Sequence, residues 1–372
     1  MSTFTHLGVK KDFVKSLKEL KITTPTEIQE KAIPVLLKSK KDFIGLAQTG
    51  TGKTAAFGLP VLHQIDADKP VVQALILSPT RELVQQIKKQ LFKFTKYSDD
   101  RIFLEAVFGG EKIDKQLKNL ERTTHVIVAT PGRLLDLIKR GTVDLSNVKT
   151  VVLDEADEML SMGFKKELDA ILTHTGTTKN TWLFSATMPE GIKRIIKTYM
   201  SDDAIKIAVN ESGIVNANIS HQYIKTTVRQ KTADIIEFLV TKGQGRGIIF
   251  CKTKLGTQAL TKELADEGFS VGALEGDMTQ KDRDKVMRAF KNETVQVLIS
   301  TDVSARGIDV NDLEYVIHHQ LPDQLEYYTH RSGRTARAGK KGISIAFILP
   351  VELERLIQIQ KTLGIKFKEE NL

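Results

Sequence analysis

The sequence has few of the features that mark secreted or membrane proteins. Its 372 residues include one cysteine, Cys251, so no disulfide can form within the chain, and a reducing compartment is expected. Cys251 lies in an apolar run, where a small buried side chain is its expected role. No apolar stretch approaches the roughly eighteen residues of a membrane helix, and the start does not resemble a signal peptide. We therefore expect a cytoplasmic protein without a membrane segment.

Aromatic residues are also scarce, at 6% of the sequence. Hydrophobic residues make up 41% and charged residues 27%, which are ordinary values for a soluble globular protein. A chain of this length exceeds the size at which a single hydrophobic core usually stops growing, so we expect two domains. The 55 Lys and Arg residues outnumber the 46 Asp and Glu residues, and the net charge of +9 favours a polyanionic partner such as nucleic acid.

Short apolar runs recur between longer helical patterns in both halves of the chain. They lie at residues 72–77, 125–129, 151–153, 182–185, 247–251, 295–300, 315–318 and 343–349. Such runs, bounded by turn residues, indicate βαβ units and therefore an α/β fold with parallel sheets covered by helices on both faces. Residues 208–218 are small and polar, as in a linker. We predict an N-terminal domain at 1–208, a linker at 209–217 and a C-terminal domain at 218–372.

A glycine-rich segment at 47–54 (AQTGTGKT) follows a strand-like stretch at 42–46. Glycines let backbone N–H groups crowd around phosphate oxygens, a lysine adds positive charge, and a following Thr offers a hydroxyl to magnesium. Ala47 stands where the strict pattern has Gly, but the residues that make the turn are retained. The predicted nucleotide-binding residues here are Thr49, Gly50, Thr51, Gly52, Lys53 and Thr54.

An acidic segment at 154–157 (DEAD) follows the apolar run at 151–153. A carboxylate at the end of a buried strand suits magnesium, usually through water, and its neighbour can orient the attacking water. Alone, each segment could be an unremarkable turn or helix start; together they predict nucleotide hydrolysis. The second half has no Gly-Lys-Thr loop, but it carries HRSGRTAR at 330–337. These arginines are expected to reach a nucleotide held by the first half; the alternatives are a basic solvated loop or a nucleic-acid contact that does not depend on phosphate.

Further segments occur in a recognisable order. They are PTEIQ at 25–29, PTREL at 79–83, GG at 109–110, TPGR at 130–133, SAT at 185–187, IFC at 249–251, Q-x-x-R at 280–283, STD at 300–302 and RG-x-D at 306–309. With the loop, the acidic tetrapeptide and the arginine block, the chain resembles the DEAD-box ATP-dependent RNA helicases of superfamily two over nearly its whole length. The resemblance implies two tandem RecA-like domains, each a mainly parallel β-sheet flanked by helices.

The resemblance also implies an ATP site with a magnesium ion. Lys53 would bind phosphates, Thr54 and Asp154 would hold the metal partly through water, and Glu155 would position the attacking water. Arg334 and Arg337 would contact the γ-phosphate. The catalytic residues are thus expected to be Lys53, Asp154, Glu155, Arg334 and Arg337.

Recognition of the base would involve Phe4, stacked on the adenine, and Gln29, which would read the adenine edge. Without the resemblance, Phe4 is better interpreted as a hydrophobic plug and Gln29 as a polar residue at a helix start. Asp309 would contact the ribose. The residues implied to couple hydrolysis to strand separation are Asp157, Ser185, Thr187 and His330.

RNA is the implied partner, contacted mostly through its sugar-phosphate backbone because no aromatic stacking platform lies among the implied contacts. These contacts are Arg81, Gly110, Thr130, Arg133, Thr253, Arg283, Thr301 and Asp302. A helix that starts after Thr130 would be a phosphate site, although Arg81 and Arg133 could instead form salt bridges. The sequence departs from the family at Glu275, where many members carry His, and at Ala336, where Gly is frequent.

We therefore expect a monomeric, ATP-dependent RNA helicase that binds RNA and locally unwinds short duplexes. An ATP-gated RNA clamp or remodelling scaffold with little unwinding is the main alternative, because it would use the same residues. A DNA helicase or translocating motor is less consistent with the acidic tetrapeptide and the Gln29 segment. A simple GTPase or kinase does not account for the second domain.

Overall fold

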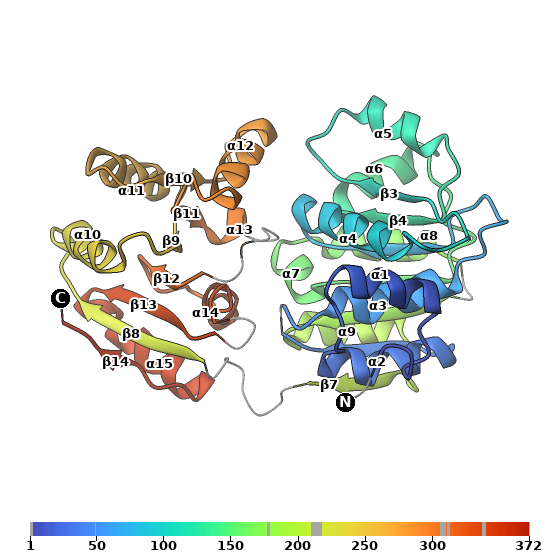
Figure 1. Cartoon of the computed structure of the whole chain (residues 1–372), viewed down its shortest axis with the longest axis horizontal. Coiled ribbons are helices and arrows are strands. Elements are labelled where there is room, and N and C mark those ends of the chain that lie inside the picture. Colours follow the sequence, from blue (N-terminus) through green and yellow to red (C-terminus); the bar gives the residue numbers. More distant parts are fainter. Residues whose placement is uncertain are drawn as a thin grey trace. The chain divides into compact units, whose positions relative to one another are not determined.

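The computed structural model describes residues 3–48, 50–176, 179–209, 218–305, 310, 313–336 and 340–371. The chain divides into two compact units, Met1–Val209 and Asn210–Leu372. Each contains a parallel seven-stranded sheet flanked by helices (Figure 1), so the expected α/β architecture with two sheets is confirmed. The linker expected at 209–217 lies outside the described residues except for Val209, and the exact domain boundaries stay a prediction.

The N-terminal unit has the strand order β3-β4-β2-β5-β6-β1-β7. Its strands are β1 (Phe43–Leu46), β2 (Ala74–Leu77), β3 (Leu104–Val107), β4 (Val126–Ala129), β5 (Thr150–Leu153), β6 (Asn180–Ser185) and β7 (Ile205–Ala208). Its helices are α1 (Lys11–Glu19), α2 (Glu27–Lys38), α3 (Lys53–Gln64), α4 (Arg81–Phe94), α5 (Ile113–Leu120), α6 (Pro131–Lys139), α7 (Ala156–Ser161), α8 (Lys165–His174) and α9 (Glu190–Tyr199).

Burial on both faces explains why the central strands consist almost wholly of apolar residues. Successive side chains of a strand point to opposite faces, and in β6 Trp182 packs into one hydrophobic cluster while Leu183 packs into another. Val152 and Val151 in β5 divide in the same way. All four residues of β2, β4 and β5 are buried, as expected for a parallel sheet covered by helices.

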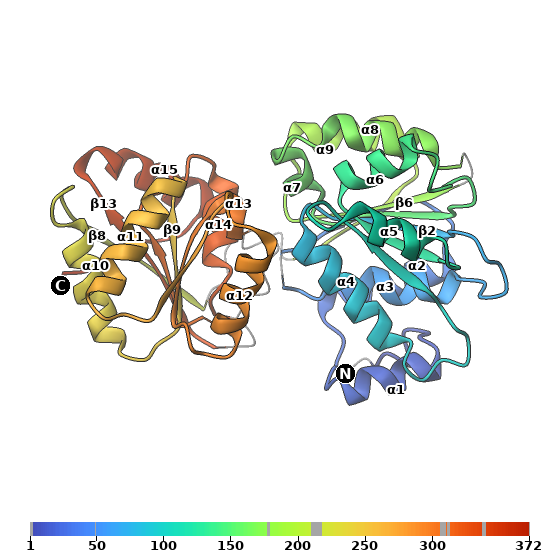
Figure 2. The same ribbon diagram turned by 90° about the horizontal axis from the view of Figure 1, so that it is seen from above.

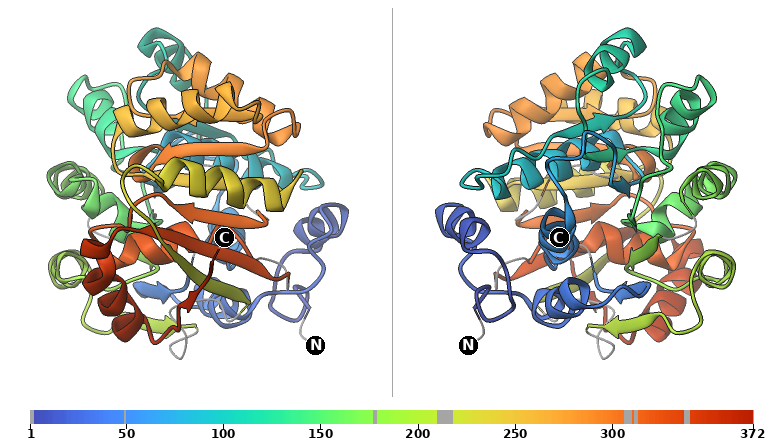
Figure 3. Two further views of the ribbon diagram at one scale, coloured as in Figure 1. Left: turned by 90° about the vertical axis from the view of Figure 1, so that its left-hand side faces the viewer. Right: turned by 90° about the vertical axis from the view of Figure 1, so that its right-hand side faces the viewer.

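The C-terminal unit has the strand order β10-β11-β9-β12-β13-β8-β14. Its strands are β8 (Ile219–Lys225), β9 (Gly247–Cys251), β10 (Val271–Leu274), β11 (Val297–Thr301), β12 (Tyr315–His318), β13 (Gly342–Ile348) and β14 (Lys368–Glu369). Its helices are α10 (Lys231–Lys242), α11 (Lys254–Asp266), α12 (Gln280–Lys291), α13 (Asp302–Ala305), α14 (Leu325–Ser332), the short 3₁₀ helix η1 (Pro350–Glu352) and α15 (Leu353–Leu363). The short β14 pairs with β8 at one edge of the sheet (Figure 3).

Every strand expected from an apolar run is present, and its ends lie within two residues of the expected ones. Cys251 ends β9 and is fully buried, which confirms its role as a small core residue. Among the described residues, every helix is too short or too polar to span a membrane.

Candidate nucleotide site and RNA-binding residues

The sequence motifs of the N-terminal unit follow the carboxyl ends of its strands. The glycine-rich loop follows β1, the acidic segment follows β5 and Ser185 ends β6, and these three strands are neighbours in the order β5-β6-β1. Ligands of open parallel sheets bind outside this edge. The fold therefore gathers the predicted nucleotide residues of this unit at one edge.

The glycine-rich loop has the backbone geometry of a phosphate cradle. Gly50 and Gly52 have φ angles of 80° and 90°, a left-handed conformation that favours glycine, and Gly52 caps α3. The hydroxyl of Thr51 donates to the carbonyl oxygen of Gln48 at 2.7 Å, which fixes the turn. The N-terminus of α3 directs backbone N–H groups toward the loop, an arrangement suited to anions. Thr49 lies outside the described residues.

Two charged side chains beside this loop are buried, and each has an atom without a hydrogen-bond partner among the described residues. Lys53 and Asp154 are both buried, and neither Nζ of Lys53 nor Oδ1 of Asp154 has a hydrogen-bond partner among the described residues. Burial raises the pKa of Asp154 to about 7, although the charge of Lys53 acts in the opposite direction. Buried charges are costly unless they are compensated. An ammonium and a carboxylate in this state fit a nucleotide phosphate and a hydrated magnesium ion.

Glu155 has a strained backbone at the same edge. Its φ of 49° and ψ of 51° lie in the left-handed region, which costs a residue with a Cβ about 1–2 kcal/mol. The backbone N–H of Glu155 is hydrogen-bonded to the Asp154 carboxylate, and its side chain is half-buried. Strain of this kind concentrates at functional sites, and here it accompanies the residue expected to position water.

Asp157 and Thr187 connect the acidic segment to the end of β6. Oδ2 of Asp157 accepts hydrogen bonds from the backbone N–H of Thr187 at 2.9 Å and from its hydroxyl at 2.7 Å. The hydroxyl of Ser185 donates to the carbonyl oxygen of Thr187 at 2.8 Å. The structure thus brings these three predicted coupling residues together, while their part in strand separation stays a prediction.

Gln29 binds the glycine-rich loop with its side-chain amide. Its Nε2 donates to the carbonyl oxygen of Gly52 at 3.0 Å, and its Oε1 accepts from the backbone N–H of Thr26 at 3.0 Å. Thr26 also donates its hydroxyl to the carbonyl oxygen of Thr51 at 2.7 Å. A role in holding the phosphate loop was not indicated by the sequence, because the residues are far apart along the chain.

Phe4 lies in the hydrophobic core of the N-terminal unit and is only 2% exposed. This position agrees with the simpler interpretation of Phe4 as a hydrophobic plug. Stacking on an adenine would require one face of its ring to become exposed, and that role stays a prediction.

The four RNA contacts predicted in the N-terminal unit lie near one another. The guanidinium of Arg81, at the start of α4, lies so close to Gly110 that a Cβ on this glycine would overlap it. Nη1 of Arg133 donates to the carbonyl oxygen of Glu111 at 3.2 Å, and the backbone N–H of Thr130 donates to Val107 at 2.9 Å. Thr130 is the N-cap of α6, which confirms the helix expected there. Neither arginine forms an ion pair within the described part of the chain.

In the C-terminal unit, three of the four predicted RNA contacts meet at α13. Thr301 donates its hydroxyl to the hydroxyl of Ser304 at 3.0 Å, and Nη2 of Arg283 donates to the carbonyl oxygen of Ser304 at 3.0 Å. Asp302 begins α13. Thr253 is the N-cap of α11, and its hydroxyl accepts from the backbone N–H of Gly256 at 3.0 Å.

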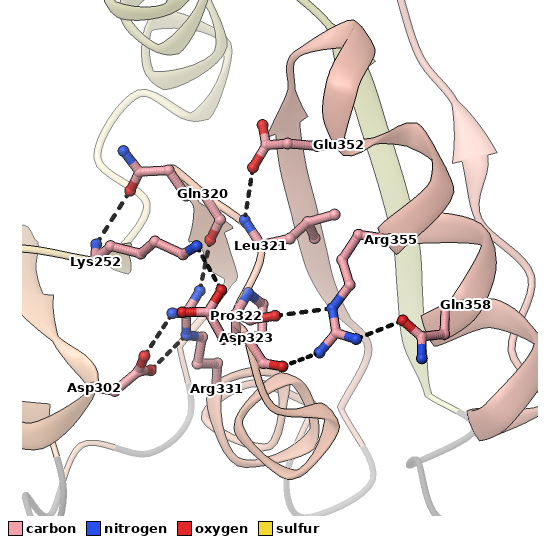
Figure 4. Close-up of polar contacts among 10 residues, drawn as sticks. All are labelled: Lys252, Asp302, Gln320, Leu321, Pro322, Asp323, Arg331, Glu352, Arg355 and Gln358. Atoms are coloured by element: carbon pink, nitrogen blue, oxygen red, sulfur yellow. Dashed lines mark hydrogen bonds and ion pairs between the residues drawn. The ribbon is translucent and has the colours of Figure 1, made fainter.

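Arg331 is a residue whose importance sequence reasoning missed. It is 1% exposed, and its Nη1 donates to the carbonyl oxygen of Gln320 at 2.8 Å and lies 3.3 Å from Nδ1 of His318. Its Nε and Nη2 bind the two carboxylate oxygens of Asp302 (Figure 4). The carboxylate of Asp302 is therefore used within the unit. The arginine-rich block at 330–337 was a signal, but spacing alone does not separate a buried arginine from an exposed one.

The loop at Gln320 that receives Arg331 is held by further contacts. Lys252, next to Thr253, donates its backbone N–H to Oε1 of Gln320 at 3.1 Å and forms an ion pair with Asp323 at 2.6 Å. Arg355 of α15 donates its Nε to the carbonyl oxygen of Pro322 at 3.2 Å (Figure 4). These contacts connect the end of β9, α14 and α15.

The predicted coupling residue His330 and the remaining predicted nucleotide residues of this unit lie partly outside the described chain. His330 and Arg334 lie in or directly after α14, whereas Asp309 and Arg337 fall outside the described residues. Ala336 has a φ of 57°, in the region that favours the glycine frequent at this position.

Glu275, the other departure from the family pattern, is buried. Its Oε1 accepts from Nε2 of Gln258 at 3.2 Å, and its Oε2 accepts from the backbone N–H of Asp277 at 2.6 Å. Glu275 therefore has a local structural role in the loop after β10.

Comparison with known proteins agrees with these observations. The DEAD/DEAH box helicase family matches residues 26–195, and the helicase conserved C-terminal domain matches residues 230–339. The chain is 42% identical over 363 residues to the DEAD-box ATP-dependent RNA helicase CshA of Bacillus cereus, covering 97% of this chain and 68% of that protein. It is 40% identical over 369 residues to the ATP-dependent RNA helicase DbpA of Bacillus subtilis, covering 99% and 76%.

A similar solved structure is that of S. cerevisiae Dbp5 bound to RNA and ADP BeF3. The TM-score is 0.90 at 31% identity, and the match covers 100% of this chain and 96% of that chain. The chain therefore belongs to the DEAD-box family of ATP-dependent RNA helicases. The family resemblance, the tandem RecA-like fold and the enzyme class expected from the sequence are confirmed.

Proposed function

We propose that this chain uses ATP binding and hydrolysis to bind RNA and to unwind short RNA duplexes locally. The proposal rests on two buried atoms, Nζ of Lys53 and Oδ1 of Asp154, which have no hydrogen-bond partner among the described residues. Both lie at the sheet edge that carries the phosphate loop. The membership in the DEAD-box family supplies the reaction class.

At the nucleotide site, Lys53 and the loop Gly50–Gly52 bind the phosphates, and Glu155 orients the attacking water. Thr54 and Asp154 would hold a Mg²⁺ ion, which when bound would supply positive charge next to the phosphates. Arg334 and Arg337 reach the γ-phosphate when the two units close on ATP, and an arginine supplied in this way can accelerate phosphoryl transfer by about a thousandfold or more.

RNA binds to the residues grouped around Gly110 in the N-terminal unit and around Ser304 in the C-terminal unit. These residues offer mainly hydroxyl, backbone and guanidinium groups to the RNA, so they contact its phosphates and 2′-hydroxyls. The preference for a particular RNA sequence is therefore slight. When the two units close on ATP, they bend one RNA strand. Release of phosphate lets the units separate again and frees this RNA strand. That the chain is a monomer and that it acts in the cytoplasm stay predictions.

The test is steady-state ATP hydrolysis with single-stranded RNA, duplex RNA and DNA of matched length. RNA should stimulate hydrolysis and DNA should not. Glu155→Gln should lower the stimulated rate about 10²–10⁴-fold, the usual contribution of a group that handles the proton of the attacking water, while RNA binding with a non-hydrolysable ATP analogue persists. Equal stimulation by DNA would contradict the assignment of RNA as the partner.

A strand-displacement assay on a short duplex separates the helicase from the clamp. The helicase releases a strand in an ATP-dependent manner. Tight retention of RNA with the analogue, combined with negligible displacement, would instead identify an ATP-gated clamp.

A further inference from the structure

One face of α4 is exposed from Gln85 onward, and Arg81 at its start is half-buried. At 3.6 residues per turn, Arg81, Gln85, Lys89 and Phe92 lie on this face, and Lys96 follows on the same side just after the helix ends. We call these five residues the α4 stripe. The opposite face packs into the core through Val84, Ile87, Leu91 and Phe94.

Three of the five stripe residues, Arg81, Lys89 and Lys96, are basic and none is acidic, and the helix as a whole is basic. Within α4, Glu82 is the only acidic residue, against Arg81, Lys88, Lys89 and Lys93. Some of this charge is neutralised, since Lys88 forms an ion pair with Glu105 at 3.0 Å and Lys96 forms one with Glu19 of α1. Lys89 and Lys93 are exposed and form no ion pair within the described part of the chain.

Phe92 lies between these lysines and is 67% exposed, the most exposed phenylalanine among the described residues. An exposed apolar residue by itself is ordinary. An aromatic ring flanked by unpaired lysines, however, is the combination with which proteins bind single-stranded nucleic acid, because bases stack on the ring while lysines meet the phosphates.

The stripe begins at Arg81, the residue that lies against Gly110 among the predicted RNA contacts. From there to Lys96 it covers about 22 Å at 1.5 Å per residue, and its far end lies close to α1 (Figure 2). We propose that the α4 stripe binds single-stranded RNA that continues beyond the segment held around Gly110. This inference rests on the proposed function. Continuity with Arg81 and the stacking face of Phe92 favour RNA over an acidic protein segment.

The experiment measures the affinity of the full chain for two unstructured RNAs in the presence of a non-hydrolysable ATP analogue. One RNA is just long enough to stimulate ATP hydrolysis fully, and the other is longer. The wild-type chain should bind the longer RNA more tightly. Phe92→Ala should reduce affinity for the longer RNA about fivefold or more, as expected for one lost base stack, and should leave the short RNA and its ATPase stimulation unchanged.

Matched variants separate stacking from charge. Phe92→Tyr keeps an aromatic face and should retain the affinity, whereas Phe92→Leu should not. Lys89→Ala should lower the slope of log affinity against log salt for the longer RNA by about 0.7. Lys197→Ala, at an exposed lysine of α9 without an ion pair among the described residues, should leave the slope unchanged.

Equal affinity of the wild-type chain for both RNAs, or unchanged affinity in Phe92→Ala and Lys89→Ala, would overturn the proposal and would leave an acidic protein as the candidate for this face. Absence of any RNA stimulation, even with the short RNA, would instead contradict the proposed function itself.

Discussion

The guanidinium of Arg331 and the carboxylate of Asp302 form a two-point ion pair, with Nε–Oδ1 at 2.6 Å and Nη2–Oδ2 at 2.7 Å. Asp302 follows Thr301 at the start of α13, and Arg331 follows His330 in α14. The pair thus joins a predicted RNA contact to the helix that carries His330, a residue predicted to couple hydrolysis to strand separation. Each oxygen of this partly exposed carboxylate already accepts one bond from Arg331, so a contact of Asp302 with RNA would use its backbone or the remaining lone pairs of the carboxylate.

We expect Arg331→Ala to destabilise the C-terminal unit by about 3–5 kcal/mol, because it leaves a carboxylate without its buried partner. Asp302→Ala should have a comparable effect, because it leaves the buried guanidinium of Arg331 without its carboxylate partner. The double variant should cost clearly less than the sum of the two, since the groups interact directly. Urea unfolding of the full chain, followed through the transition of this unit, provides the measurement, and strictly additive costs would show that the pair contributes little.

Gly110 provides a second prediction. Its φ is 85°, and a Cβ there would overlap the guanidinium of Arg81. Gly110→Ala should therefore displace Arg81 and reduce RNA affinity about as much as Arg81→Ala does, without weakening ATP binding in the absence of RNA.

Gly109→Ala is the matched control, because a Cβ at Gly109 has no neighbour within 4 Å and the backbone is not left-handed. RNA titration measures the affinity of Gly110→Ala, Arg81→Ala and Gly109→Ala for RNA. Loss of RNA affinity in Gly109→Ala equal to that in Gly110→Ala would mean that general disturbance of the loop, rather than the position of Arg81, is responsible.

The strands that the sequence did not reveal are β3, β7, β8, β10 and β14, and all of them lie at or next to the edge of a sheet. An edge strand is covered less completely, so it does not need a continuous apolar run: β7 reads IKIA and β8 reads ISHQYIK. The central strands are buried on both faces and were predictable for that reason.

The residues of the candidate site likewise fall into those that the sequence could predict and those that it could not. Residues such as Lys53 and Asp154 were predictable because short motifs after strands determine where they lie. The bond from Gln29 to Gly52 and the burial of Arg331 depend on how distant segments pack, which periodicity and spacing do not encode.

His221 provides a prediction about pH. Its Nδ1 lies 2.6 Å from the Tyr328 hydroxyl, its ring meets Phe367 edge to face, and burial lowers its pKa to about 4. Between pH 6.5 and 4 the unfolded chain binds a proton at His221 that the folded unit does not, so stability is lost as pH falls through this range. The upper limit of the loss is about 3 kcal/mol.

His221→Gln can retain a hydrogen bond to Tyr328 but does not titrate. Its unfolding free energy should consequently fall less between pH 6.5 and 4 than that of the wild-type chain. Other buried histidines are present in both proteins, and for His318 the main cause of its lowered pKa, burial, is unchanged by the substitution, although the neighbouring charge of His221 also lowers that pKa. Equal pH dependence of the two proteins would show that His221 is not the group responsible.

Thr187 allows the predicted coupling to be separated from hydrolysis. Its backbone N–H and its hydroxyl both donate to Oδ2 of Asp157. Thr187→Val keeps the backbone bond and the approximate shape but removes the hydroxyl, which leaves a buried carboxylate with one donor fewer at a cost of about 1–3 kcal/mol. The ATP-binding residues do not include Thr187, so RNA-stimulated hydrolysis should persist while strand displacement per ATP hydrolysed falls severalfold. Thr187→Ser, which restores the hydroxyl, should recover displacement. A parallel loss of both activities in Thr187→Val would place the residue in the hydrolysis step instead.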